Sequence, residues 1–386
     1  MKYFDNAATT YPKPECVYGR MNEINRSLAV NTGRGAYRAA REATEIVDRL
    51  RNKLLTLVKG RDCYDVILTP SATIALNEII GGMEWSADDM VYVSPFEHNA
   101  VMRPLYLAQK KYKFQILEMA FDSENGQIDF EKTEFSFLTN PPTKLFMTHM
   151  SNVTGYILPI EKIAKSAKEY DCEIVVDASQ SLGLLELNLR NSNFDYIAFA
   201  GHKNLYGPFG CGGFFIKKGN VLNAFLAGGT GTDSLNLEMP KEGCSRYEPA
   251  SQNIVALAGL EVALDETIEY ENEFYVNEKH LTDRLVSGLK KVRGVKLYIP
   301  GTNEKEDTHI GVVAFNVRGY KASEVGLILD EDFDIAVRTG YHCAPLIHRH
   351  LKDEDSAGVV RASVGRYTTE SDVEALIEAV KELAGE

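Results

Sequence analysis

Two residues of opposite charge, Asp177 and Lys203, each stand at or just past the end of a short apolar run. The first run is Glu173–Asp177 and the second is 194–200, which is followed by Gly201-His202-Lys203. Runs of this kind are typical of buried parallel strands in an α/β sheet. Side chains just past such strands converge on the crevice at the carboxyl edge of the sheet. An amine and a carboxylate at this edge suit pyridoxal phosphate, with Lys203 forming the Schiff base and Asp177 keeping the pyridine nitrogen protonated.

Polar residues also follow other predicted strands. Thr69-Pro70-Ser71-Ala72-Thr73 ends one strand and opens a helix, whose free N–H groups and dipole would favour a phosphate. Taken alone, these residues are more simply explained as an ordinary helix cap. Likewise, His98 could stack on an aromatic ring or be a plain loop residue, and 151–155 also fits a turn. Polar groups at five successive strand ends together favour one shared site.

Charge, length and cysteine usage exclude several classes of protein. The chain has 386 residues and a net charge of −13, which argues against nucleic acid or an anionic membrane as the main partner. We expect no signal peptide and no membrane span, because no apolar run is long enough. Six scattered cysteines without a Cys-x-x-Cys pair indicate a reduced, cytoplasmic protein without a metal site.

The alternation of apolar runs and amphipathic stretches predicts an α/β fold. The large domain, 15–255, should hold a mostly parallel sheet covered by helices, and 256–386 with 1–14 should form a smaller α+β domain. Only a Gly-rich loop precedes Gly212–Lys217, so this strand should be antiparallel and the sheet mixed. Ser371 and Glu374 predict a capping box for the last helix. The predicted strands are 66–69, 90–94, 113–118, 145–149, 173–177, 195–200, 212–217, 295–298, 309–316, 336–338 and 359–363, and the helices 38–58, 72–81, 100–111, 160–170, 253–289, 322–329 and 371–383.

Nearly the whole chain resembles the class V aminotransferase family of fold-type-I pyridoxal-phosphate enzymes, and within it the cysteine desulfurases and selenocysteine lyases. The motifs that carry the resemblance are the opening segment 3–10, Glu97-His98, 151–155, Asp177-Ala178-Ser179-Gln180, Gly201-His202-Lys203, the segment 338–344 and Arg361-Ala362-Ser363.

The resemblance implies a role for each matching residue. Catalytic residues would be Lys203, Cys343 and His98, and the cofactor would be bound by Ala72, Thr73, His98, Asn152, Asp177, Gln180, His202, Lys203 and Ser251. The substrate would be bound by Asn6, Ala7, Arg34, Asn152 and Arg361. Among these, Arg361 would bind the carboxylate of the substrate. The implied protein is a homodimer in which Ser251 reaches the partner's active site.

The implied reaction converts L-cysteine to L-alanine and transfers sulfur to Cys343 as a persulfide, from which a sulfur-acceptor protein could take it. Lys203 would move the Cα proton, and His342 or the substrate amine would activate the thiol. Cys343 could instead be a small buried hydrophobic residue, or a metal ligand together with His348 and His350. A selenocysteine lyase, another C–S lyase or an aminotransferase would use the same cofactor site without the cysteine nucleophile.

The sequence departs from the family pattern in the surroundings of the cofactor. Asn204 is an extra residue after Lys203, Ser251 stands near the position of a threonine, and Leu105 replaces a tryptophan. Arg34 lacks the histidine that often precedes it. These differences affect the expected substrate pocket rather than the cofactor site.

Overall fold

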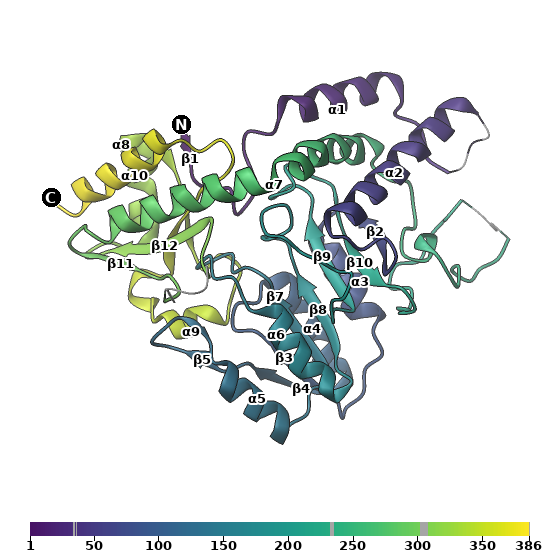
Figure 1. Cartoon of the computed structure of the whole chain (residues 1–386), viewed down its shortest axis with the longest axis horizontal. Coiled ribbons are helices and arrows are strands. Elements are labelled where there is room, and N and C mark those ends of the chain that lie inside the picture. The colour runs from purple at the N-terminus through teal and green to yellow at the C-terminus, as the bar shows by residue number, and fades with distance from the viewer. Residues whose placement is uncertain (34, 36, 232–234, 302–307, 386) are drawn as a thin grey trace.

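A seven-stranded sheet forms the centre of the larger unit in the computed structural model, which describes residues 1–33, 35, 37–231, 235–301 and 308–385 (Figure 1). In spatial order its strands are β2 (Tyr64–Thr69), β10 (Gly212–Lys217), β9 (Tyr196–Ala200), β8 (Glu173–Asp177), β7 (Lys144–Thr148), β3 (Met90–Val93) and β4 (Gln115–Glu118). Strand β10 is antiparallel to β2 and β9, whereas the pairs from β9 to β4 are parallel. The predicted mixed, mostly parallel sheet is confirmed.

Successive side chains of these strands alternate between two apolar clusters because a strand presents its residues to opposite faces. In β8, Ile174 and Val176 join one cluster and Val175 joins the other. Both faces are covered, which explains why the strands read as nearly continuous apolar runs. The first cluster includes residues of α2 (Arg38–Leu57), α6 (Ile160–Ala167) and α7 (Ile254–Leu289), and the second includes residues of α3 (Ala72–Gly82) and α4 (Asn99–Tyr112).

The smaller unit is a four-stranded antiparallel sheet with helices packed on it. Its strands, in spatial order, are β11 (Val295–Leu297), β12 (Val312–Val317), β15 (Val359–Ser363) and β14 (Arg338–Gly340), and its helices are α8 (Ala322–Phe333) and α10 (Glu370–Leu383). The N-terminal strand β1 (Lys2–Tyr3) pairs with β13 (Ile335–Ala336), and Phe4 lies in this unit's core.

Helix α7 belongs to both cores and crosses between the two units (Figure 1). Leu257, Leu260 and Leu264 pack in the large core, whereas Leu281 and Leu285 pack in the small one. Between the two sets, Tyr270 departs from helical geometry. The domain limits at 15–255 and 256–386 stay a prediction.

The structure corrects several predicted boundaries. The last helix is capped by Thr369 with Asp372 at the third helical position, not by Ser371 and Glu374, because Thr369 is the residue with extended backbone before the helix. The predicted strand 309–316 begins only at Val312, since Gly311 has a φ of +74°. The predicted strand 336–338 is divided between β13 and β14, which pair with different strands.

Several short elements were not predicted from the sequence: α1 (Glu15–Ser27), α5 (Phe130–Thr139), α9 (Ile347–Leu351), the hairpin of β5 (Phe121–Asp122) and β6 (Gln127–Ile128), and the 3₁₀ turns Cys244–Arg246 and Glu354–Ser356. The end of the predicted helix 160–170 is a further 3₁₀ turn, Lys168–Tyr170. Within the described ranges, no helix has the length and apolar character needed to cross a membrane.

Candidate active site

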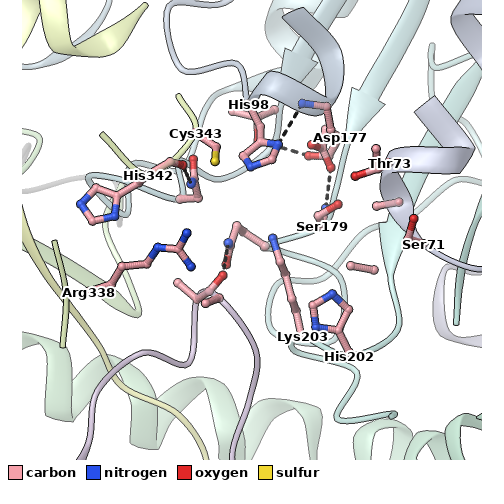
Figure 2. A pocket seen from close by; sticks show the side chains of 18 of the residues that line it. Ser71, Thr73, His98, Asp177, Ser179, His202, Lys203, Arg338, His342 and Cys343 are labelled. Atoms are coloured by element: carbon pink, nitrogen blue, oxygen red, sulfur yellow. Dashed lines mark hydrogen bonds between the residues drawn. The ribbon is translucent and has the colours of Figure 1, made fainter. Parts of the chain in front are cut away.

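A cavity of about 220 Å³ lies at the carboxyl edge of the large sheet, where the small unit faces it (Figure 2). Most of the residues predicted to form the site line it: Ala7, Ala72, Thr73, His98, Asn152, Asp177, Gln180, His202, Lys203, Cys343 and Arg361. Asn6 and Ser251 do not line this cavity in the single chain, and Arg34 lies outside the described residues. The roles of these residues stay predictions.

Asp177 and Lys203 approach the cavity from neighbouring strand ends (Figure 2). Asp177 ends β8, and its Oδ1 accepts a hydrogen bond of 2.9 Å from the Ser179 N–H. Lys203 follows β9 through a tight turn. Burial lowers the pKa of its amine to about 8, an effect that Asp177 opposes and Arg361 reinforces. A larger fraction of Lys203 is therefore neutral and nucleophilic near pH 8 than for an ordinary lysine.

The N-terminus of α3 forms another side of the cavity. Ser71 caps this helix, with its Oγ accepting from the Ile74 N–H at 3.3 Å, and Ala72 and Thr73 provide the first helical residues. Gly212 of β10 packs so closely that a Cβ there would lie 2.9 Å from the Ala72 nitrogen. The unpaired first-turn N–H groups of a helix are suited to holding a phosphate.

Two neutral histidines flank this cavity. The Nδ1 of His98 accepts from the Ala100 N–H at 3.0 Å, which leaves its Nε2 to carry the proton, and burial lowers its pKa to about 4. His202 contacts Thr9 Oγ1 through Nδ1 at 3.1 Å, and burial lowers its pKa to about 4 as well. An uncharged imidazole at position 98 suits stacking on an aromatic ring.

Glu97, beside His98, is a fully buried carboxyl group. Its Oε1 accepts hydrogen bonds from Ser94 Oγ at 2.5 Å and from the Thr148 N–H at 2.6 Å, so it joins the ends of β3 and β7. Oε2 has no hydrogen-bond partner among the described residues. Burial, with a contribution from Asp177, raises the pKa of Glu97 to about 8, so this side chain is neutral at pH 7.

Arg361 of β15 enters the cavity with its guanidinium already partly engaged. Its two terminal nitrogens donate to the Asn152 carbonyl at 2.9 Å and to Asp5 Oδ1 at 2.6 Å, whereas Nε is buried without a hydrogen-bond partner in the described part of the chain. Arg338 of β14 stands opposite Arg361 in the antiparallel register and also lines the cavity. Arg338 was not among the predicted site residues, although it begins the motif that contains Cys343.

Cys343 lies on a strained loop at the cavity, on the side of His98 (Figure 2). His342 and Cys343 have φ values of +45° and +56°, which non-glycine residues adopt at a cost. The Cys343 carbonyl accepts from the Asn99 N–H at 2.6 Å, and the Asn152 side chain donates to the His342 carbonyl at 2.8 Å. These bonds hold the loop against α4 and the 151–155 turn. The thiol is exposed, which argues against the alternative of a buried hydrophobic role.

The histidines near Cys343 make their described hydrogen bonds with other groups. His342 Nε2 contacts the Val359 carbonyl, its Nδ1 is buried without a hydrogen-bond partner among the described residues, and burial lowers its pKa to about 3. His348 contacts Asp353 and the Tyr341 carbonyl, and His350 contacts Glu118. No group of three possible metal ligands was found among the described residues.

The lining fits pyridoxal phosphate. Asp177, Lys203 and the α3 N-terminus offer a partner for the ring nitrogen, for the aldehyde and for the phosphate, respectively. The hydroxyl of Ser179 is buried at the cavity without a hydrogen-bond partner among the described residues, as expected of a group that awaits a ligand. Ser71 and His342, which the sequence analysis also considered, line the cavity as well, and further lining residues without a predicted role are Ala8, Ala100, Thr148, Ser179 and Ala200.

Comparisons with known proteins agree with this geometry. Residues 2–376 match the family described as aminotransferase class-V. The chain is 29% identical to a probable cysteine desulfurase of Methanothermobacter thermautotrophicus and 30% identical to one of Pyrococcus abyssi; each alignment covers 99% of this chain and 94% of the relative. The structure of apo cysteine desulfurase from Thermococcus onnurineus is similar with a TM-score of 0.89 and 28% identity, over 100% of this chain and 94% of that one.

Proposed function

Because the chain belongs to the class V aminotransferase family, we propose that it is a cysteine desulfurase that converts L-cysteine to L-alanine and retains the sulfur on Cys343. The family uses pyridoxal phosphate, in agreement with the cofactor expected from the sequence. The observation that carries the proposal is that Lys203, Asp177, Arg361 and Cys343 line one cavity.

When bound, pyridoxal phosphate supplies an electron sink for bonds at the substrate carbon atoms. Lys203 would hold the cofactor through its amine, and the same amine would serve as general base for the Cα proton of the substrate. Asp177 would be the partner of the ring nitrogen and would favour its protonated form. His98, a neutral imidazole, would stack on the ring.

The substrate carboxylate is assigned to Arg361 and Arg338. These like charges stand opposite each other on adjacent strands, an arrangement that is unfavourable unless an anion lies near both. Asp5 and the Asn152 carbonyl fix the plane of the Arg361 guanidinium, so little side-chain freedom is lost when the substrate binds.

Cys343 acts on the substrate sulfur. Its thiolate forms an S–S bond while the substrate Cβ–S bond breaks, and the electron pair of that bond stays with the carbon, which is protonated on the way to alanine. Burial lowers the pKa of His342 to about 3, which makes this imidazole a weak base, so the proton of the Cys343 thiol is assigned to the substrate amine.

The proposal extends to the location of the enzyme in the cell, its oligomeric state and its sulfur acceptor. We place it in the cytoplasm, supported by six free cysteines. We further propose a homodimer in which Ser251 reaches the partner's phosphate site, and an acceptor protein that takes the sulfur from the exposed Cys343 thiol.

Turnover with L-cysteine tests the function. We expect equal amounts of alanine and enzyme-bound sulfur, with a persulfide on Cys343 found by mass spectrometry. Cys343→Ala should form no persulfide but keep the absorbance of the bound cofactor, and Cys16→Ala, at another exposed thiol, should behave as wild type. Pyruvate or a keto acid as the product, or wild-type activity in Cys343→Ala, would contradict the proposal.

A further inference from the structure

The turn that carries Lys203 is fastened by three separate segments of the chain. Thr10 Oγ1 donates to the Lys203 carbonyl at 3.1 Å. The side chain of Asn204, the residue after Lys203, donates to the Gln180 carbonyl. The third anchor is Arg366, whose guanidinium donates to the Asn204 carbonyl at 3.2 Å. The Asn204 carbonyl belongs to the peptide group that follows Asn204, so a shift of this group reaches the Cα of Lys203 through the single residue Asn204.

The surroundings of Arg366 hold it rigidly. Its guanidinium lies 4.1 Å from the ring centroid of Tyr206 and 3.9 Å from that of Phe274, between two aromatic side chains. It donates to Thr267 Oγ1 at 2.8 Å, and its backbone N–H donates to the Tyr206 hydroxyl at 2.6 Å. Two rings and directed hydrogen bonds leave the planar group little freedom.

These contacts connect Arg366 to both halves of α7. Thr267 precedes the non-helical Tyr270 and Phe274 follows it, so Arg366 bridges the irregularity at which α7 passes from the large core to the small one. Glu278, further along α7, is buried as well, and burial raises its pKa to about 8, an effect that the nearby Arg366 opposes. Arg366 therefore couples the Lys203 turn to the region where the two units meet.

Arg366 is also tied to the substrate side of the cavity, since it lies five residues after Arg361. The segment between them is confined. The Val364 N–H donates to the Gly311 carbonyl at 3.0 Å, and a Cβ on Gly365 would lie 2.7 Å from the Tyr206 hydroxyl. A displacement at one end of this segment is not absorbed within it, because packed interiors transmit strain.

We propose that Arg366 is a positioning residue that fixes the Lys203 amine relative to the carboxylate site at Arg361, an inference that rests on the proposed function. Arg366 is not among the described residues that line the cavity, and it acts through Asn204. Lysine cannot replace it, because an ammonium group offers no planar face for two rings and no fixed pair of donors.

Arg366→Lys and Arg366→Ala test the proposal, with Arg284→Ala as the matched control because Arg284 forms its ion pairs on the outside of α7, with Glu370 and Glu374. We expect kcat for L-cysteine to fall about 10- to 100-fold in both Arg366 variants, since displacements near 1 Å have effects of that size. KM should change less than kcat, because Arg361 keeps its own hydrogen bonds to Asp5 and to the Asn152 carbonyl. Arg284→Ala should keep wild-type kcat.

A second readout needs neither cofactor nor turnover. The rate at which Lys203 of the apo-protein is acetylated, followed by mass spectrometry against pH, reports the pKa of its amine. Burial lowers this pKa to about 8. If loss of Arg366 frees the Lys203 turn, the midpoint of the acetylation rate against pH should move upward, toward the usual 10.5. A purely structural role of Arg366 would lower the melting temperature and leave the midpoint in place, which would overturn the proposal.

Phe274→Leu provides a milder change if Arg366→Ala does not fold, because it removes one ring and keeps the arginine; its midpoint should move in the same direction. Wild-type behaviour of Arg366→Lys in both kcat and midpoint would refute the inference. If the wild-type protein itself forms no persulfide from cysteine, the proposed function fails, whereas the acetylation midpoint still decides the role of Arg366.

Discussion

Replacing Glu97 by glutamine should change how the stability of the protein depends on pH. Glu97 is fully buried, and its pKa is raised to about 8 from the usual 4.5, chiefly by burial. Between these two values the native protein holds a proton that the unfolded chain has lost. The stability of the wild type should therefore fall as the pH rises through this interval. Glutamine does not ionise, so the Glu97→Gln variant should lack this pH dependence of stability.

The size of the effect follows from the one proton by which the native and unfolded states differ. A difference of one proton changes the free energy of unfolding by about 1.4 kcal/mol per pH unit, so that of the wild type should fall by roughly 5 kcal/mol relative to Glu97→Gln between pH 4.5 and 8. The amide oxygen can still accept from Ser94 Oγ and the Thr148 N–H, but its NH₂ has two donor hydrogens where the neutral carboxyl group has one on Oε2, and no partner is described there. The additional unpaired donor lowers stability by about 1–3 kcal/mol at every pH. The variant should thus be less stable at pH 5 and more stable at pH 8.

Denaturant unfolding of the cofactor-free protein at several pH values measures this difference. Glu131→Gln, on the exposed side of α5, is the control and should follow the wild-type curve. If the curves of the wild type and Glu97→Gln run parallel from pH 5 to 8, Glu97 is not neutral in the native protein, and the reasoning from its burial is wrong.

Three further predictions concern the cavity. The rate at which cofactor-free protein captures added pyridoxal phosphate should rise with pH and reach half of its maximum near pH 8, where half of the Lys203 amines have lost their proton; a midpoint near pH 10.5 would contradict the lowered pKa. Arg361→Lys should raise KM for L-cysteine about 10- to 100-fold with a smaller effect on kcat, since directed charge-assisted hydrogen bonds are lost; an unchanged KM would place the carboxylate elsewhere. Asp177→Asn should lower kcat at least about tenfold and shift the absorbance of the bound cofactor, and wild-type values for both would remove Asp177 from the ring nitrogen.

The sequence was sufficient to predict the central strands and the chemistry at their ends. Strands such as Glu173–Asp177 and Gly212–Lys217 were predicted with the bounds that the structure shows, because both faces of the sheet are covered and the apolar runs are continuous. The polar residue that ends such a run is then placed at the sheet edge by the chain itself. This is why Asp177 and Lys203 could be predicted to share one site although they lie 26 positions apart in the sequence.

Only the tertiary structure brought together groups whose neighbours are distant in sequence. Arg338 became a site residue through the register of β14 on β15, and Asp5 contacts Arg361 because the N-terminal segment is bound to the small unit. The protonation state of Glu97 depends on its burial and on the Thr148 N–H of another strand. Local patterns of apolar and polar residues determine which segments become strands and helices, whereas pairing register, burial and contacts of high sequence separation depend on how those segments pack.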